Sequence, residues 1–254
     1  MNIQIVVASH KQYWMPKNDI FIPLQVGSEE NKSIPGFQRD DKDENISRKN
    51  GTYCELTGLY WAWKHLDADY IGLVHYRRYF ARRIALGKKH RIADEKAITN
   101  ALKNAEAVLP RKRHYVLETN YSHYAHAHHE EDLLLAEQII AERYPEYLPD
   151  FNRTMHKRSG HRFNLLIMRK DLFRRYCVWL FELLFELEGR LDTSAYTGLN
   201  ARVYGLVSER LLDVWVEHNK IHYVELPVVH LESQHWPKKV FHFLERKFST
   251  STAH

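Results

Sequence analysis

Cysteine is scarce in this 254-residue sequence, which contains only Cys54 and Cys177. Both lie in apolar patterns typical of helices, so a disulfide framework is excluded and a reducing compartment is predicted. The chain also has no internal repeat, no low-complexity tract and no clear linker. A length of 254 residues with 44% hydrophobic content therefore predicts one elaborated domain over residues 1–254 rather than two.

Long hydrophobic runs are absent as well. No segment approaches the ~18 apolar residues that a membrane-spanning helix requires. Residues 1–11 lack the basic leader and the long apolar core of a signal peptide. We therefore expect a cytoplasmic protein that meets a membrane, if at all, at the inner face of the cell membrane.

The charge balance is moderately basic, with a net charge of +5 and a pI near 9.0. That balance suits several anionic partners, namely nucleotides, nucleic acid and the anionic surface of a membrane. Charge alone does not choose among these partners, so the choice depends on where the basic residues lie.

Short apolar runs alternate with amphipathic helical patterns along most of the chain. This alternation predicts an α/β fold with a mostly parallel central sheet flanked by helices, and a helical C-terminal half. Residues 20–26 are interrupted by Pro23 and predict an edge strand or an irregular segment. Residues 28–48 and 121–129 predict loops. The predicted strands are 3–8, 71–74, 108–110, 161–168 and 221–229, and the predicted helices are 52–64, 94–103, 130–143, 171–189 and 208–217.

A cationic and aromatic cluster, His75-Tyr76-Arg77-Arg78, ends the predicted strand 71–74. In open α/β sheets the ligand crevice lies outside the carboxyl ends of the strands. Two arginines and a histidine at such an end suggest an anionic ligand such as a phosphate. The alternative interpretation is a solvated basic turn.

The helix expected from Thr52 begins with a plausible capping box, because Glu55 follows the Thr52 N-cap by three residues. Its amino end then points at the loop 45–51, which contains Gly51. A helix amino end beside a glycine is a ready anion site, although most such ends bind only water.

The order of loop, helix, acidic pair and strand resembles the middle of a GT-A nucleotide-sugar domain. In that family an Asn/Gly-containing loop and a helix precede a strand whose end carries a metal-binding Asp-x-Asp. Here the strand ends in His-Tyr-Arg-Arg instead. Asp67-Ala68-Asp69 spells Asp-x-Asp but lies at the start of the strand, on the wrong edge for the crevice, so we interpret it as unrelated to a metal site.

A closer resemblance covers nearly the whole chain. The segments IVVASHK, NISRKNGTYCELTGLYWAWKH, YIGLVHYRRYF, RFNLLIMRKDLFRRYCVWLFELLFELE and YGLVSERLL resemble a bacterial family of capsular and exopolysaccharide biosynthesis proteins. That family was formerly known only as a domain of unknown function of the DUF4422 type. The resemblance implies a GT-A-like glycosyltransferase with a nucleotide-sugar half at about 1–115, an acceptor half at about 116–235 and a basic aromatic tail at 236–254.

The same resemblance implies a reaction and its partners. The donor would be a UDP-sugar, with UDP-galactofuranose implied by some members, and the acceptor a lipid-linked oligosaccharide in capsule, exopolysaccharide or O-antigen synthesis. The departing diphosphate needs a metal ion or fixed cations. Since His75, Arg77 and Arg78 are expected to supply that charge, no cofactor is expected, and a divalent metal remains an alternative.

Further donor-binding residues follow from the resemblance, because GT-A enzymes hold the uridine and part of the diphosphate at the end of the first strand. Each of these residues has an alternative role in a loop or a cap. The expected donor set is Ser9, His10, Lys11, Asn45, Asn50, Glu55, His75, Tyr76, Arg77 and Arg78.

A general base is expected near the acceptor hydroxyl, and a carboxylate is the usual choice. Glu209, in the predicted first turn of the helix after Gly205, resembles the acidic residue that follows the acceptor region in many GT-A enzymes. The alternative is that Glu209 only complements its helix dipole. Asp132, with its neighbours Glu130 and Glu131, is a second candidate, and His161 and Asn164 are candidate acceptor contacts, with a structural role for Asn164 as the alternative.

Two other functions remain open. His123, His126, His128 and His129 have spacings that suit zinc, which would fit a metal-dependent hydrolase, but they lack the HExxH order. The basic loops 82–91 and 111–114 suggest a nucleic-acid-binding module. They match no usual recognition motif, so no nucleic acid is expected as a partner. The tail 236–248 predicts peripheral contact with an anionic membrane, or a terminal helix packed on the core.

Overall fold

A mixed β-sheet in the order β10-β6-β9-β4-β1-β2-β3 forms the centre of the computed structural model, which describes residues 1–82 and 87–232. The predicted tail 236–254 lies outside the described residues. β5 pairs with β4 and β11 beside this path, and β7 and β8 form a separate pair. The strands are β1 (Ile3–Ser9), β2 (Phe21–Gln25), β3 (Gln38–Arg39), β4 (Tyr70–His75), β5 (Arg78–Phe80), β6 (Ala107–Pro110), β7 (Arg113–His114), β8 (Ser159–Gly160), β9 (Leu166–Arg169), β10 (Tyr223–Leu226) and β11 (Val228–His230).

The strand directions make the sheet mostly parallel in its first half. β1 runs parallel to both β2 and β4, and β6 runs parallel to β10. β9 enters between β4 and β6 and is antiparallel to both. The carboxyl ends of β1, β2 and β4 therefore share one edge with the amino end of β9.

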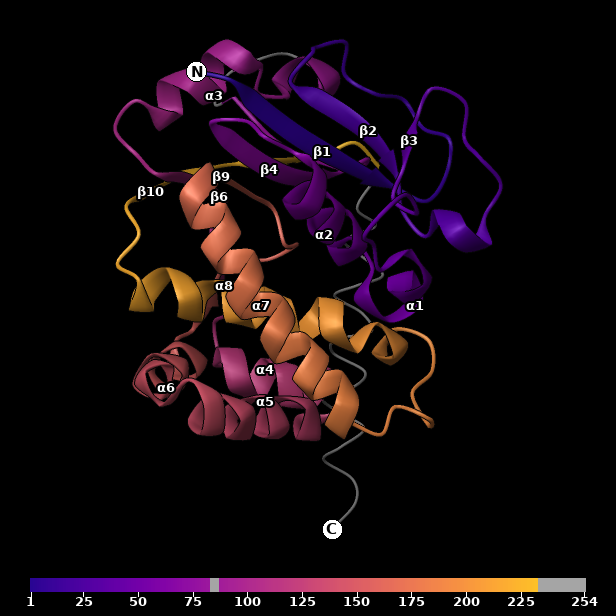
Figure 1. Cartoon of the computed structure of the whole chain (residues 1–254). Helices are drawn as coiled ribbons and strands as arrows, with labels where there is room; N and C mark the ends of the chain where they lie inside the picture. The colour runs from indigo at the N-terminus through magenta and orange to yellow at the C-terminus, as the bar shows by residue number, and fades with distance from the viewer. Residues whose placement is uncertain (83–86, 233–254) are drawn as a thin grey trace.

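Helices lie on both faces of the sheet (Figure 1). In Figure 1, α3 lies above the sheet, and α4, α5 and α6 gather below it. In the same view α7 and α8 lie between the sheet and these three lower helices. The helices are α1 (Asn50–Tyr53), α2 (Leu56–His65), α3 (Glu95–Leu102), α4 (Asn120–Ala127), α5 (Glu130–Arg143), α6 (Leu148–His156), α7 (Lys170–Arg190) and α8 (Val203–His218), and short 3-10 turns occupy 28–30, 47–49, 89–91, 145–147 and 200–202.

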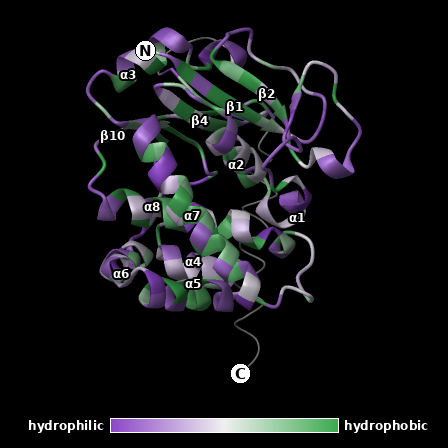
Figure 2. Ribbon diagram, viewed as in Figure 1, coloured by the Kyte–Doolittle hydropathy of each residue, from purple (hydrophilic) through white to green (hydrophobic). Residues whose placement is uncertain are grey.

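Both faces of β1 are buried, which explains its unbroken apolar run. Val6 and Ala8 pack into the core that contains the buried residues of α2, α7 and α8. Ile5 and Val7 pack into a second core with α3 on the other face. Figure 2 shows hydrophobic stretches along the central strands β1, β2 and β4. The predicted α/β fold with a mostly parallel sheet flanked by helices is confirmed.

Several predicted elements are wrong in detail. The helix expected over 52–64 is two helices, because Cys54 adopts φ 54° between α1 and α2. Thr52 therefore caps nothing, and its hydroxyl donates to the carbonyl of Lys49. The predicted loop 121–129 is mostly α4, which begins with a reciprocal capping box between Thr119 and Ser122.

The remaining differences concern strand ends and one helix start. β2 lies between β1 and β3 and is not an edge strand. β9 begins only at Leu166, because Phe163 and Asn164 adopt φ 77° and 51° and cannot continue a strand. α8 begins at Val203, so Ser208 is buried inside the helix and is not its cap.

Gly72 in β4 offers a test of this packing. A Cβ at Gly72 would meet the backbone oxygen of Leu166 and Cγ1 of Ile167 at 2.8 Å. The backbone oxygen cannot yield without moving β9, so Gly72→Ala is expected to lower the free energy of unfolding by about 1–3 kcal/mol. Urea denaturation measures the difference. Gly189→Ala in α7, where the added Cβ meets nothing within 4 Å, is the control and should be neutral or stabilising; equal stability of the two variants would contradict the prediction.

Candidate functional site

Three strand tips meet at one edge of the sheet because β1 and β4 are parallel and β9 runs the other way. Ala8 pairs with His75, and Leu73 pairs with Leu166 at the start of β9. Residues that follow β1 and β4 therefore share this edge with Asn164, two positions before β9. The predicted donor residues at this edge are Ser9, His10, Lys11, His75, Tyr76, Arg77 and Arg78.

Asn164 joins three parts of the chain. Its Nδ2 donates to Oε1 of Glu55 at 2.7 Å and to the carbonyl of Gly205 at 3.0 Å. Its Oδ1 accepts from the hydroxyl of Ser208 at 2.8 Å. Nε2 of His75 lies 3.6 Å from the same Glu55 oxygen. These bonds hold Asn164 in a left-handed conformation, which for a residue with a side chain costs energy and is typical of functional sites.

His75 is neutral in this setting. Burial, together with the neighbouring charge of Arg78, lowers its pKa to about 3. Nη1 of Arg78 lies 3.2 Å from Nδ1 of His75, so Nδ1 accepts and Nε2 carries the proton. The expectation that His75 supplies positive charge is therefore not supported, and the ring offers one N–H to its surroundings instead. Burial also raises the pKa of Glu55.

Two arginines border the buried carboxyl of Glu55. The guanidinium of Arg78 lies 4.6 Å from the ring centroid of Phe163, and its buried Nε has no hydrogen-bond partner in the part of the chain that the structure describes. Nε of Arg202, just before α8, donates to Sγ of Cys54 at 2.9 Å, and Nη2 lies 3.9 Å from Oε2 of Glu55. Within residues 1–82 and 87–232, Arg78 forms no ion pair with a carboxylate, and Arg202 forms only the long one with Glu55.

Glu209 lies beside these groups, in the second turn of α8. Its side chain is 17% exposed, and Nη1 of Arg210 lies 3.3 Å from its carboxylate. Its charge is close enough to raise the pKa of His75 and to stabilise the charges of Arg78 and Arg202. Since Glu209 is not in the first turn, the interpretation that it only complements the helix dipole is wrong.

The outer cations of the edge are paired. Nζ of Lys11 lies 3.4 Å and Nη1 of Arg77 lies 3.0 Å from the carboxylate of Glu232. Tyr76 is buried and makes edge contacts with the rings of His10 and Tyr13. Lys11, Arg77 and Glu232 therefore form a rim around the inner group of Glu55, His75 and Arg78.

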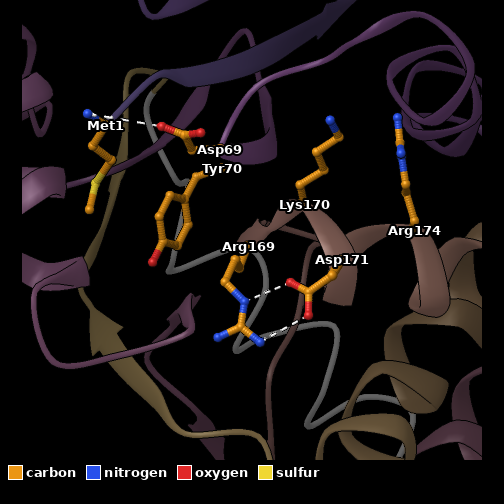
Figure 3. Close-up of a pocket in the computed structure, with 7 residues that line it drawn as sticks. All are labelled: Met1, Asp69, Tyr70, Arg169, Lys170, Asp171 and Arg174. Atoms are coloured by element: carbon orange, nitrogen blue, oxygen red, sulfur yellow. Dashed lines mark hydrogen bonds and ion pairs between the residues drawn. The ribbon is translucent and has the colours of Figure 1, made fainter.

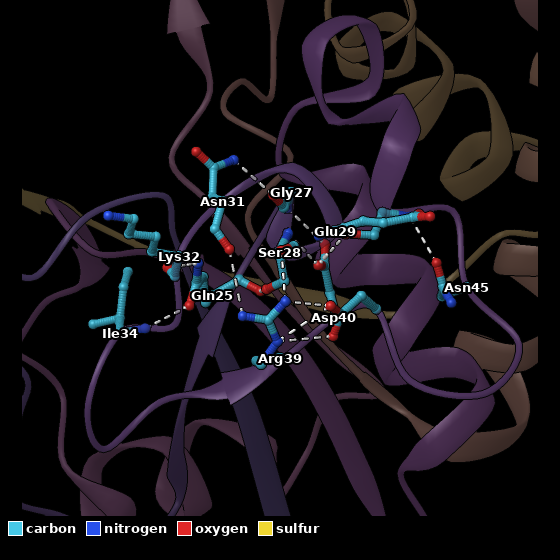
Figure 4. A network of polar contacts seen from close by, with 12 residues as sticks. Gln25, Gly27, Ser28, Glu29, Asn31, Lys32, Ile34, Arg39, Asp40 and Asn45 are labelled. Carbon is cyan, nitrogen blue, oxygen red and sulfur yellow. Dashed lines mark hydrogen bonds and ion pairs between the residues drawn. The ribbon is translucent and has the colours of Figure 1, made fainter.

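The loop 28–48 is closed by one buried carboxylate, Asp40 (Figure 4). It accepts hydrogen bonds from the backbone N–H groups of Gly27 and Ser28 and from the hydroxyls of Ser47 and Thr57. Thr57 belongs to α2, so these bonds fasten the loop to the helix that begins directly after Glu55. The sequence analysis did not single out Asp40.

Asn45, Asn50 and Ser9 make local bonds. Oδ1 of Asn45 accepts from the backbone of Ser47, and Nδ2 of Asn50 donates to the carbonyl of Cys54. The hydroxyl of Ser9 donates to the carbonyl of Lys11. These three predicted donor residues shape the loops around the edge, and within the described residues no hydrogen bond or ion pair joins their side chains to Glu55, His75 or Arg78.

Asp132 and His161 are buried in other surroundings. Asp132 accepts hydrogen bonds from the hydroxyls of Tyr124 and Tyr196, both at 2.7 Å, and burial raises its pKa. His161 is fully buried, with Nδ1 against Asp213 and Nε2 3.2 Å from Glu225. The structure does not bring either residue to the strand-tip group.

The four histidines of 123–129 do not converge on one point. They contact Arg210, Glu118 and Asn200: His123 lies by Arg210, His126 by Glu118, and His128 and His129 by Asn200. Among residues 1–82 and 87–232, no group of three or more His, Cys, Asp and Glu side chains is placed to hold a metal ion. These positions do not support the metal-dependent hydrolase.

The Asp-x-Asp sequence lies at the opposite edge of the sheet, where β4 starts. Asp69 accepts a hydrogen bond from the backbone of Asn2, and Asp67 pairs with Lys170 and Arg174. Figure 3 shows the hollow at this edge. It is lined by Met1, Asp69, Tyr70, Arg169, Lys170, Asp171 and Arg174, and none of these residues belongs to the strand-tip group.

Sequence reasoning missed Cys54, Phe163 and Arg202. Cys54 and Phe163 are important because their backbones adopt positive φ angles. Neither cysteine nor phenylalanine predicts such an angle from the sequence. Arg202 reaches Glu55 only because α8 packs against α1. A single arginine in a polar stretch carries no local signal of that contact.

Comparison with known proteins identifies relatives of this fold. A family model described as "Domain of unknown function (DUF4422)" matches residues 4–220. The solved structure of the apo form of WbbM, a bifunctional glycosyltransferase, superposes with a TM-score of 0.86 at 28% sequence identity, covering 92% of this chain and 46% of that chain. This chain thus spans about half the length of that protein. No curated protein matches it.

Within the described ranges, none of the helices combines the length and the apolar character needed to cross a bilayer.

The buried His75 predicts a pH dependence of stability. In the unfolded chain His75 binds a proton below its ordinary pKa of 6.5, whereas in the folded protein it binds that proton only near pH 3. The free energy of unfolding therefore falls as the pH falls from about 6.5 to about 3. His75→Gln is expected to reduce that slope by about 1.4 kcal/mol per pH unit between about pH 6 and 4. Urea denaturation at several pH values measures it. The exposed His126→Gln is the control, and equal slopes for His75→Gln and the unaltered protein would refute the prediction.

Proposed function

This chain belongs to the DUF4422 family, and from that membership and the site's geometry we propose that it is a glycosyltransferase using a nucleotide-sugar donor. One observation carries the proposal. Arg78 and Arg202, which have no carboxylate oxygen closer than 3.9 Å in the described chain, lie within electrostatic range of the carboxylate of Glu209 at the carboxyl edge of a glycosyltransferase-like sheet. This arrangement places positive charge, which can stabilise a leaving group, near a carboxylate that can act as a base.

The inner arginines are the proposed cations for the donor diphosphate. Glycosyl transfer develops negative charge on the departing diphosphate, and fixed cations in a partly buried site stabilise it strongly. Among the described residues Arg78 has no ion pair and Arg202 only one at 3.9 Å with Glu55, whereas Lys11 and Arg77 are already paired with Glu232. The neutral His75 adds a hydrogen-bond donor. In this mechanism the arginines perform the role that a divalent metal performs in other sugar transferases.

Glu209 is the proposed base. An inverting transfer needs a group that accepts the proton of the acceptor hydroxyl as the new bond forms. Glu209 is partly exposed, and its carboxylate acts electrostatically on Arg78 and Arg202. Glu55 is less suited to this role because its carboxyl is more deeply buried and already accepts from Asn164.

The finer assignments follow the family resemblance. We propose a UDP-sugar donor, with UDP-galactofuranose the first to be examined, and a lipid-linked oligosaccharide acceptor of capsule, exopolysaccharide or O-antigen synthesis. The reaction would then take place in the cytoplasm at the inner face of the cell membrane, with the tail 236–254 as the proposed membrane contact.

The nucleic-acid alternative gains no support from the described basic residues. Arg82 pairs with Asp94, and Lys112 donates to the hydroxyl of Tyr223. Arg111 and Arg113 are exposed, but they follow β6 and do not join the basic residues near Arg82 through any contact in the described chain. They form no continuous basic stripe of the kind that follows a nucleic-acid backbone.

Binding of UDP tests the donor site. Arg78→Ala is expected to weaken UDP binding about tenfold or more, because a hydrogen bond to a charged group is worth roughly 1.5–3 kcal/mol. Thermal stabilisation by UDP, GDP and dTDP, followed by calorimetry, measures the effect. Arg174→Ala, at the opposite edge of the sheet, is the matched control. Unchanged UDP affinity in Arg78→Ala, or absence of any nucleotide binding, would overturn the proposed donor site.

Replacing Glu209 separates binding from catalysis. Glu209→Gln is expected to leave UDP affinity unchanged and to slow transfer by about 100-fold or more, the range typical of a lost general base. Release of UDP from the UDP-sugar in the presence of acceptor measures transfer. Asp132→Asn is the comparison: if it abolishes transfer while Glu209→Gln retains full activity, the base has been assigned to the wrong carboxylate.

A further inference from the structure

Two of the four histidines of 123–129 hold a single asparagine. Nδ1 of His128, at the end of α4, lies 2.9 Å from Oδ1 of Asn200, and Nε2 of His129 lies 3.1 Å from Nδ2 of the same residue. An amide oxygen accepts and an amide nitrogen donates, so Nδ1 of His128 carries a proton and Nε2 of His129 does not. The junction of α4 and α5 therefore satisfies both ends of the Asn200 amide.

The same junction holds a second side chain of the loop 191–199, which follows α7. The ring of Tyr196 stacks on His129 at 4.1 Å between centroids, and its hydroxyl donates to Oδ1 of Asp132 at 2.7 Å. Asp132 also accepts from Tyr124 of α4. Most residues of this loop are exposed, so these contacts, together with those of the asparagine that follows it, fasten a segment that has little packing of its own.

Asn200 begins the 3-10 turn that ends in Arg202, one of the two proposed donor cations. The backbone N–H of Arg202 donates to the carbonyl of Leu199 at 3.2 Å. The next residue, Val203, is buried at the start of α8. The backbone at Arg202 is therefore fixed by helix packing on one side and by the side chain of Asn200 on the other.

The guanidinium of Arg202 is held only loosely by its own contacts. Its side chain is 44% exposed, and its ion pair with Glu55 is long, at 3.9 Å. Its hydrogen bond to Sγ of Cys54 uses a weak acceptor. A long side chain that is ordered only when a ligand arrives loses rotamer freedom at that moment, and this loss weakens binding. The turn that carries Arg202 therefore determines how far the cation is ordered in advance.

We propose that Asn200 is a positioning residue that orients Arg202 toward the donor diphosphate. The inference rests on the proposed function and deepens it, because it assigns the α4–α5 junction to the donor site. A fixed cation stabilises the charge of a leaving group best when it is in place before the reaction. His128 and His129 act on this site through the asparagine, and neither forms a hydrogen bond with Arg202 in the described chain.

UDP and uridine together test this role on the full chain. Asn200→Ala is expected to weaken UDP binding about threefold to tenfold, the effect of losing roughly one hydrogen bond. Uridine has no diphosphate, so its affinity should not change. In the double variant Asn200→Ala/Arg202→Ala the loss should be no larger than in Arg202→Ala alone, because an absent arginine cannot be misplaced. Calorimetry measures UDP binding, and NMR titration measures the weaker binding of uridine.

A second variant and a control accompany this test. His129→Phe keeps a ring against Tyr196 but removes the nitrogen that accepts from Asn200, so it should also weaken UDP binding and leave uridine binding unchanged. It carries the test if urea denaturation shows that Asn200→Ala does not fold. Gln138→Ala removes an exposed amide on α5 that donates to Glu142, and it should leave UDP affinity unchanged.

Three results would overturn the positioning role while the donor site at Arg78 still stands. Equal losses of UDP and uridine affinity would show that Asn200 has a structural role alone. Additive losses in the double variant would show that it does not act through Arg202. Unchanged UDP affinity in both Asn200→Ala and His129→Phe would show that the contact has no effect on the donor. Absence of nucleotide binding by the unaltered protein would instead refute the proposed function.

Discussion

The contact between Asn164 and Glu55 is the interaction on which the site depends. Asn164 is the only side chain described that links the start of α2, the approach to β9 and the interior of α8 through its own amide. Both ends of that amide are satisfied, so the left-handed backbone at Asn164 is held by three hydrogen bonds. The same contact holds the Glu55 carboxyl in place beside His75, because a buried carboxyl without a donor would be costly.

Burial decides what each ionisable group at this edge contributes. His75 is neutral because a charged imidazole would lose its hydration beside Arg78. Arg78 and Arg202 keep their charges, since arginine does not deprotonate in proteins. The more exposed Glu209 contacts Arg210 and acts electrostatically on Arg78 and Arg202. The proposed chemistry follows from these charges, with the arginines as partners of the donor diphosphate and the carboxylate as the base.

Much of the fold could be predicted because hydrophobic periodicity is local. β4, β6, α3, α5 and α7 lie close to where the apolar pattern placed them. The errors occurred where a single residue departs from its usual backbone conformation, as at Cys54 and Asn164, or where a cap uses Ser122 in place of the usual acidic residue. The strand-tip cluster could be predicted because it directly follows an apolar strand, and residues at strand ends lie at the sheet edge. Arg202 and Arg210 could not, because a helical sequence pattern does not show which of its residues face the site.

The sequence by itself determined the class of fold and the edge of the sheet where chemistry is expected. A strand that is apolar on both faces must be buried on both, and polar residues at its end must lie at the sheet edge. Tertiary structure alone decided which charges are free. Lys11 and Arg77 are neutralised by Glu232, more than 150 positions away in the chain, whereas among the described residues Arg78 forms no ion pair and Arg202 forms only a long one, at 3.9 Å, with Glu55. Pairing and desolvation depend on distances between segments, and those distances do not exist until the chain has folded.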